Sequence, residues 1–475
     1  MEIYNSLSRK KDKFEPPSNK KISIYVCGPT VYDEPHIGHA RSAYVFDVIR
    51  RYLLYRYKNI GVMFVRNVTD VDDKIIDKAR KEYPGEDING AVKKVSQKYL
   101  DAYHRDMDAL EIMRPDKEPK ATEYIEKMKE FIKVLIEKGA AYQAGGDVYF
   151  DIKKAKDYGK LSNQSLDKME MTARVAHGEN KRDPLDFALW KTVKEGEPSW
   201  PSDWGNGRPG WHIECSVMSS DILSDEFDIH GGGLDLIFPH HENEVAQSEG
   251  AGKRFAKIWI HNGLLTINGQ KMAKSLGNFI TIQNFITKYK KADLLKLFFL
   301  SARYAHPIDY TDEKIEEAKK EYERIDILLK RFDRAFGTRD ISEKIAGGAG
   351  DAGNFKNKFI EYMDDDFNTP RALSVVFDMI NWCNISLDNN EKNKELMLAH
   401  AMGILKEMTG VLGLSFIIEK SDELPDDDIA WKISARNALR KEKKFKEADD
   451  IRKTLELKGI ILEDTKDGTT WRRKI

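Results

Sequence analysis

One stretch near the N-terminus restricts the fold of this chain more than any other. An apolar run over residues 22–27 stops at Gly28-Pro29 and predicts a short buried strand. A helical pattern follows over residues 36–57, and a second apolar run covers residues 61–67. A strand, a crossover helix and another strand make the unit of a parallel sheet, so we expect the chain to open with an α/β domain.

The remaining sequence indicates further domains. With 475 residues, the chain is too long to fold around a single compact core. We therefore expect roughly two to four domains. Residues 157–210 are rich in turn formers and tryptophan, which indicates an insertion. Strand-like runs return at residues 227–230 and 258–261. The pattern is then helical over 314–412. A linker is expected at 423–428, and helices followed by a hairpin complete the chain.

Composition excludes several classes of protein. Hydrophobic residues make up 41% of the chain and charged residues 33%. There is no apolar run of the ~20 residues that cross a bilayer and no secretory signal, so we expect a cytoplasmic protein with no membrane partner. Three cysteines, Cys27, Cys215 and Cys383, are too few for a disulfide framework. Residues 431–475 hold 14 Lys and Arg against 8 Asp and Glu, a surplus that suits either a nucleic-acid contact or a solvated helix.

Two histidines stand at the start of the first predicted helix, in His36-Ile37-Gly38-His39. Three positions apart, they face the same way, toward amides and a helix dipole that favour phosphate. Gly38 leaves room for a flat base. On their own, two such histidines are more simply explained by helix capping or by solvent.

A second motif, Lys271-Met272-Ala273-Lys274-Ser275, follows an Asn268-Gly269 turn and is expected on a loop. Two lysines there could stabilise the charge that develops on a triphosphate, although a lysine-rich loop alone is more often plain surface. Together, the two motifs resemble the HIGH and KMSKS signatures of class I aminoacyl-tRNA synthetases. Ala273 stands where that pattern has serine, so a hydroxyl is lost and both lysines remain.

Other segments resemble the cysteinyl-tRNA synthetase family over nearly the whole chain. They are residues 27–30 (CGPT), 67–70 (NVTD), 210–215 (GWHIEC), 230–233 (HGGG), 238–244 (FPHHENE), 363–370 (MDDDFNTP) and 468–473 (GTTWRR). The resemblance implies one zinc per chain, held by Cys27, Cys215, His240 and Glu244. Two sulfurs, a nitrogen and an oxygen suit tetrahedral zinc, whereas the spacing alone would favour two buried free cysteines.

The resemblance also implies a reaction and its residues. L-Cysteine would be activated with ATP to cysteinyl-adenylate and transferred to tRNA(Cys), with Mg²⁺ accompanying the nucleotide. The implied catalytic and ATP-binding residues are His36, Gly38, His39, Lys271 and Lys274. The residues implied to hold cysteine are Thr69, Trp211 and Asp235. We expect a monomer.

The expected fold is a Rossmann-like parallel-sheet catalytic domain with an insertion, followed by a helical bundle and a small C-terminal α+β module. The expected boundaries are 1–140 and 211–313 for the two catalytic halves, 141–210 for the connective insertion, 314–420 for a tRNA-contacting bundle and 429–475 for an anticodon-binding module. Two alternatives remain. An amino-sugar cysteine ligase of the mycothiol type would need no anticodon module, and a non-catalytic RNA-binding relative would need neither signature nor the metal ligands.

Overall fold

The computed structural model describes residues 1–165, 180–336, 350–389, 394–415, 426–458, 460–465 and 468–473. The chain forms two compact units, Met1–Lys319 with Asp340–Ser415, and Lys320–Arg339 with Phe416–Ile475. Residues 423–425 of the predicted linker lie outside the described residues, and residues 426–428 are not a linker but the first turn of α14 (Asp426–Lys441). No helix in the described ranges is both long enough and apolar enough to span a membrane.

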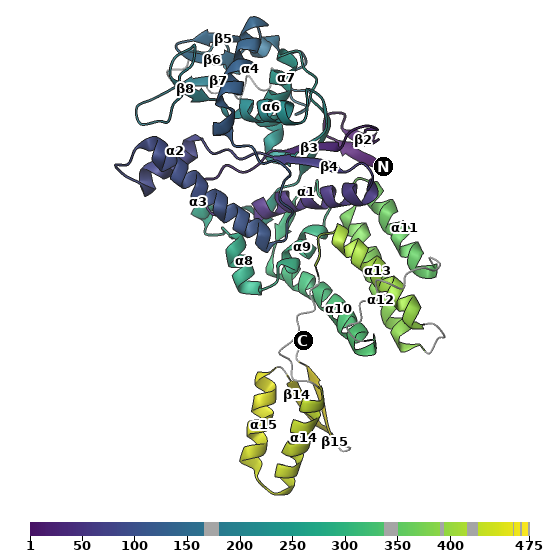
Figure 1. The fold of residues 1–475 in the computed structure, drawn as a ribbon. Helices are drawn as coiled ribbons and strands as arrows, with labels where there is room; N and C mark the ends of the chain where they lie inside the picture. The colour runs from purple at the N-terminus through teal and green to yellow at the C-terminus, as the bar shows by residue number, and fades with distance from the viewer. Residues whose placement is uncertain are drawn as a thin grey trace. The chain divides into compact units, whose positions relative to one another are not determined.

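A parallel sheet of four strands forms the centre of the first unit, in the order β10-β9-β3-β4. Its strands are β3 (Ile22–Val26), β4 (Val62–Arg66), β9 (Phe227–Gly233) and β10 (Ala256–Asn262). Helix α1 (Ile37–Arg56) connects β3 to β4 and lies beside them (Figure 1). The predicted strand, crossover helix and strand are therefore confirmed, and α1 is buried on most of its sides, as expected of a helix inside a large domain.

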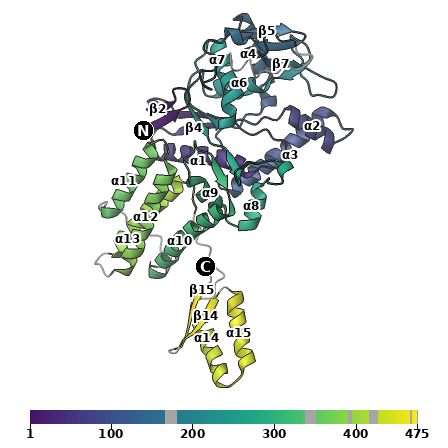
Figure 2. The same ribbon diagram turned by 180° about the vertical axis from the view of Figure 1, so that it is seen from behind.

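Between β4 and β9 the chain adds helices and a second sheet. The elements in order are α2 (Asp73–Glu82), α3 (Ile88–Ala109), η1 (Ala121–Tyr124), α4 (Ile125–Glu137), β5 (Ala141–Ala144), β6 (Asp147–Phe150), η2 (Ile152–Lys154), β7 (Phe187–Thr192), β8 (Gly207–Pro209) and α6 (Trp211–Ile222). Strands β5 to β8 form an antiparallel sheet that shares an apolar core with α4 and α6 (Figure 2). Strands β7 and β8 lie within the turn-rich stretch 157–210 that predicted an insertion, whereas β5 and β6 precede that stretch.

Short elements complete the first unit around the central sheet. They are β1 (Glu2–Asn5), β2 (Lys10–Lys13), η3 (Leu234–Leu236), η4 (Ile237–His241), α7 (Glu242–Gly250), β11 (Leu265–Ile267), β12 (Gln270–Lys271), η5 (Lys274–Leu276), α8 (Ile282–Tyr289), α9 (Ala292–Leu300) and β13 (Ile308–Tyr310). Strand β11 pairs with β12 and β13. Asn268 and Gly269, both at positive φ, make the tight turn between β11 and β12.

Helices make up the remainder of the chain up to a terminal hairpin. They are α10 (Asp312–Phe336), α11 (Gly350–Asp364), α12 (Thr369–Asp388), α13 (Lys394–Val411), α14 (Asp426–Lys441) and α15 (Phe445–Leu457). Helices α11, α12 and α13 lie side by side in both views (Figures 1 and 2). The hairpin of β14 (Ile460–Thr465) and β15 (Gly468–Arg473) packs with α14 and α15 around a small apolar core, so the predicted order of helices followed by a hairpin is confirmed.

Candidate active site and metal centre

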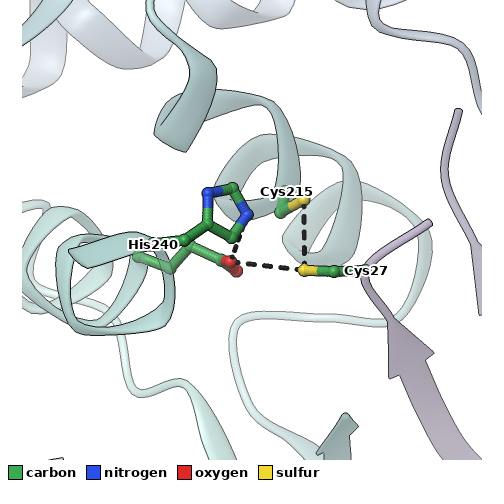
Figure 3. A group of neighbouring side chains, drawn as sticks. Cys27, Cys215 and His240 are labelled. Carbon is green, nitrogen blue, oxygen red and sulfur yellow. Dashed lines mark hydrogen bonds and ion pairs between the residues drawn. The ribbon is translucent and has the colours of Figure 1, made fainter. Parts of the chain in front are cut away.

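Four side chains from separate elements converge just beyond the carboxyl end of β3. Cys27 follows β3 directly, Cys215 comes from α6, His240 from η4 and Glu244 from α7. One ligand atom from each lies within 4.8 Å of all the others. Cys27 Sγ is 3.5 Å from both Cys215 Sγ and Glu244 Oε1, and His240 Nε2 is 3.0 Å from Glu244 Oε1 (Figure 3). This is the edge at which open parallel sheets bind ligands.

The donor atoms in this cluster, and the charge on Glu244, are those of a metal site. Burial raises the pKa of the Cys27 thiol, and the neighbouring Cys215 and Glu244 raise it further. Burial acts in the same direction on Glu244, but the imidazoles of His230 and His240 outweigh it and bring the carboxyl pKa to about 2. A buried carboxylate beside two thiols and an imidazole is the mixed sulfur, nitrogen and oxygen set that binds tetrahedral zinc. The donor set therefore fits zinc, and the residues expected to hold the metal do meet.

A second group of possible ligands overlaps the first and was not predicted. Cys27, His230, His241 and Glu244 also place their ligand atoms within 4.8 Å of one another. His230 Nε2 lies 2.8 Å from Glu244 Oε2, and His241 Nε2 lies 3.3 Å from Cys27 Sγ. Histidine next to a metal-binding carboxylate commonly fixes the orientation of that ligand. Two sequence features could have indicated this second group: the adjacent histidines His240 and His241, and the HGGG segment that begins at His230.

Asn67, which follows β4, connects the metal cluster to the neighbouring strand. Its Oδ1 accepts a hydrogen bond from the Gly28 amide at 2.9 Å and lies 3.6 Å from Cys215 Sγ. A Cβ atom on residue 28 would come within 1.6 Å of the Asn67 carbonyl oxygen. Glycine is therefore required at position 28 for the two strand ends to approach, which places Cys27 opposite Cys215.

The three residues expected to hold cysteine lie in different settings. Thr69 is buried, and its hydroxyl donates to Glu214 Oε2 at 2.7 Å. The Trp211 ring is 40% exposed and its centroid lies 4.3 Å from that of His240, at the edge of the metal cluster. Asp235 is exposed on η3, and within the described ranges no hydrogen bond or ion pair joins it to the cluster. The structure thus brings Trp211 to the cluster and leaves Asp235 outside these contacts.

His36 and His39 form a reciprocal cap at the start of α1. His36 Nδ1 accepts from the amides of Gly38 and His39 at 3.1 and 3.4 Å, and His39 Nδ1 accepts from the His36 amide at 3.3 Å. Burial lowers the pKa of His36 to about 4 and that of His39 to about 3. Both rings are thus neutral near pH 7. Because Nδ1 accepts in each ring, Nε2 carries the proton and is the available donor.

The loop after β12 lies against this cap. Lys271 ends β12 and Lys274 begins η5, and both side chains are exposed. The backbone amide of Ile37 donates to the carbonyl of Ile280 at 3.1 Å, which fastens the end of the loop to the start of α1. The Lys274 ammonium pairs with the Asp33 carboxylate and lies 5.0 Å from the centroid of the Phe279 ring. The two sequence motifs are therefore neighbours in the structure.

Known proteins match this chain along its full length. Residues 13–320 match the tRNA synthetases class I (C) catalytic domain, residues 358–416 the DALR domain and residues 433–472 the cysteinyl-tRNA ligase anticodon binding domain. A cysteine–tRNA ligase of Thermococcus gammatolerans is 47% identical, covering 99% of this chain and 98% of the relative. One from Geobacillus thermodenitrificans is 46% identical with the same coverage. The chain belongs to the cysteinyl-tRNA synthetase family.

Solved structures agree with this fold. A Mycobacterium tuberculosis methionyl-tRNA synthetase in complex with methionyl-adenylate gives a TM-score of 0.59 at 15% identity, covering 83% of this chain and 90% of that chain. An arginyl-tRNA synthetase described as putative, from Campylobacter jejuni, gives 0.56 at 16% identity, covering 84% and 94%. At such low identity the likeness concerns the fold alone, and it agrees with the Rossmann-like domain with an insertion and a following helical region.

The alanine at position 273 leaves the backbone contacts of this loop in place. The amide of Ala273 donates to Asn278 Oδ1 at 2.8 Å, and Asn278 Nδ2 donates to the Lys271 carbonyl at 3.2 Å. Asn278 therefore bridges the loop through the backbone on either side of Met272. The missing hydroxyl at position 273 does not enter either contact.

Proposed function

We propose that this chain carries out the cysteine–tRNA ligase reaction of its family at the carboxyl edge of the β10-β9-β3-β4 sheet. L-Cysteine and ATP would give cysteinyl-adenylate and pyrophosphate, and a ribose hydroxyl at the end of tRNA(Cys) would then attack the adenylate. The observation that carries the proposal is the cluster of Cys27, Cys215, His240 and Glu244. A metal cluster that would bind a thiol, at the end of the strand that leads into α1 and its histidine motif, supports a cysteine-activating enzyme.

The metal cluster would select the amino acid. Zinc held by the four side chains, one ion per chain, would supply a Lewis acid with affinity for sulfur, for which the hydroxyl of serine is a poorer ligand than a thiolate. A pocket that relied on shape would separate such near-isosteres by only ~100-fold. Trp211 would close the pocket beside His240, and Thr69 and Asp235 would serve the amino and carboxylate groups of the substrate.

The two signatures would bind and activate ATP, with Mg²⁺ entering as part of the nucleotide complex. His36 and His39 would donate Nε2–H to phosphate oxygens as neutral imidazoles, and the positive end of the α1 helix dipole would favour the phosphates further. Gly38 would admit the base. Lys271 and Lys274 would contact the charge that grows on the leaving pyrophosphate, which is stabilisation confined mainly to the transition state.

The helical bundle at 314–420 and the C-terminal module at 429–475 would contact tRNA(Cys). The match of residues 433–472 to an anticodon binding domain supports this role and disfavours the amino-sugar ligase and the non-catalytic relative. We propose a monomer acting in the cytoplasm, where tRNA is charged. Residues 141–210 would be the connective insertion between the catalytic halves 1–140 and 211–313.

An aminoacylation assay tests the proposed function directly. The purified chain should attach radiolabelled cysteine to bulk tRNA in the presence of ATP, and serine should be a poor substrate. A control reaction with deacylated tRNA from which tRNA(Cys) has been removed should give no product. Formation of a cysteinyl amino sugar without charging of tRNA would instead establish the alternative ligase.

A further inference from the structure

The Lys274 ammonium forms an ion pair with a carboxylate of the same chain. It pairs with the Asp33 carboxylate, and the exposed fractions of the two side chains are 57% and 21%. It also lies 5.0 Å from the centroid of the Phe279 ring, whose edge packs against His36 with centroids 5.3 Å apart. The ion pair is thus seated beside the histidine cap at which the triphosphate would bind.

Asp33 is held in place independently of Lys274. It lies in the segment between β3 and α1, and its Oδ1 accepts from the amide of Glu34 at 3.0 Å. Lys78 on α2 places its ammonium 3.8 Å from the same carboxylate. Burial would raise the pKa of Asp33, but the Lys274 ammonium and the Glu34 amide outweigh this effect and lower it. The carboxylate therefore stays ionised and fixed while the lysine side chain can leave it.

We propose that Asp33 is a positioning residue that competes with the phosphates of ATP and of pyrophosphate for the Lys274 ammonium. The inference rests on the proposed role of Lys274 in ATP activation. In the free enzyme, Asp33 keeps the lysine beside the cap of α1. After adenylate formation, the carboxylate recaptures the lysine, and pyrophosphate leaves with one fewer cationic contact.

The size of the effect follows from the exposure of the pair. An exposed ion pair changes an equilibrium by up to about 5-fold. Replacing Asp33 by a neutral residue removes this competitor and also removes a negative charge near the bound phosphates, and both changes favour phosphate binding. The apparent affinities for ATP and pyrophosphate should therefore rise together by about 2- to 5-fold, because the same lysine contacts both.

ATP–pyrophosphate exchange measures both affinities in one assay. In Asp33→Asn we expect KM for ATP and KM for pyrophosphate to fall by about 2- to 5-fold, while the maximal rate does not increase. Asp33→Glu keeps the charge and should restore values close to those of the parent. Glu34→Gln is the matched control, because it removes an adjacent carboxylate that pairs with Arg105 at 3.3 Å and does not contact Lys274. Asp33→Ser is a second neutral variant, and thermal melting checks that each variant folds.

The Lys274→Ala background separates this inference from the proposed function. There, Asp33→Asn should lower both KM values by clearly less than it does in the parent, because only the repulsion between the Asp33 carboxylate and the phosphates is left to remove. The inference is overturned if both KM values are unchanged or raised in the folded neutral variants Asp33→Asn and Asp33→Ser, if Glu34→Gln lowers them equally, or if the fall is as large without Lys274 as with it. Exchange that is unaffected by Lys274→Ala itself would instead refute the proposed role of that lysine.

Discussion

His36 and His39 cap each other's backbone amides at the start of α1, and their rings stack with centroids 3.7 Å apart. This arrangement holds both imidazoles neutral and turns both Nε2 atoms away from the cap. A motif recognised for its chemistry is therefore also part of the helix itself. Substitution of either histidine is therefore expected to change the stability of the protein as well as its activity.

The depressed pKa of His36 predicts an acid-dependent loss of stability. Its folded pKa is about 4 against an ordinary 6.5, so the unfolded chain binds the proton more readily. The contribution of neutral His36 to the free energy of unfolding is complete above about pH 6.5, and it is lost as the pH falls toward about 4. His36→Asn keeps an acceptor for the cap and removes the titration.

The free energy of unfolding of His36→Asn should therefore depend less on pH in this window, by up to about 1.4 kcal/mol per pH unit. Denaturant unfolding at several pH values measures the slope, with His306→Asn, at an exposed position, as the matched control. Parallel curves for the parent and His36→Asn would refute this account of the cap.

The Lys274 ammonium is expected to act mainly in the transition state of adenylate formation. Lys274→Ala should slow ATP–pyrophosphate exchange by at least ~10-fold, the effect of losing one electrostatic contact of ~1.4 kcal/mol. Lys10→Ala, which removes an exposed lysine from β2, is the control and should exchange normally. A maximal rate equal to that of the parent would remove Lys274 from the mechanism.

The metal cluster is expected to hold about one zinc per chain. Metal analysis should find this content in the parent and in Cys383→Ala, because Cys383 is buried in α12 away from the cluster. Cys27→Ala should lose most of the zinc, since only three protein ligands remain and one of the two sulfur donors is gone. Full zinc content in Cys27→Ala would show that the metal is held elsewhere.

Recognition of the substrate sulfur can be tested on the zinc itself. X-ray absorption at the zinc edge should gain a sulfur scatterer when cysteine is added, because zinc favours a thiolate ligand. Serine at the same concentration is the control and should leave the spectrum unchanged. Zinc whose coordination does not respond to saturating cysteine would be structural, and selection would then have to come from the pocket walls.

Removal of the C-terminal module should separate the two half-reactions. A chain that ends at residue 424 keeps the parallel sheet and both signatures, so it should form adenylate at the rate of the parent. Charging of tRNA(Cys) should fall sharply, because the residues matched to the anticodon binding domain are gone. ATP–pyrophosphate exchange and aminoacylation measure the two steps, and equal losses in both would show that the module supports folding.

Local sequence was sufficient to predict the start of the central sheet. The expected strands at 22–27 and 61–67 and the helix at 36–57 agree with β3, β4 and α1 to within about a residue at each end. Apolar runs closed by glycine and proline carry that information within a short window. The C-terminal helices and hairpin were predicted for the same reason.

Long-range pairing was not accessible in this way. The strand order of β5 to β8 was not predicted, because β6 and β7 pair across a long stretch of sequence. The hairpin of β1 and β2 is local, but it was not predicted either. The partner of Lys274 was also missed, since Asp33 lies 241 positions away and a single aspartate carries no pattern. The metal ligands were identified only through family motifs, because their spacing resembles no compact zinc motif.

The wide spacing of the metal ligands also bears on how the protein is made. Cys27 leaves the ribosome early, and Glu244 follows it by 217 residues. A metal bound by all four side chains is acquired only after both halves of the parallel sheet and the intervening insertion have been synthesised and have come together. Zinc uptake by the nascent chain would thus report that the catalytic domain is topologically complete.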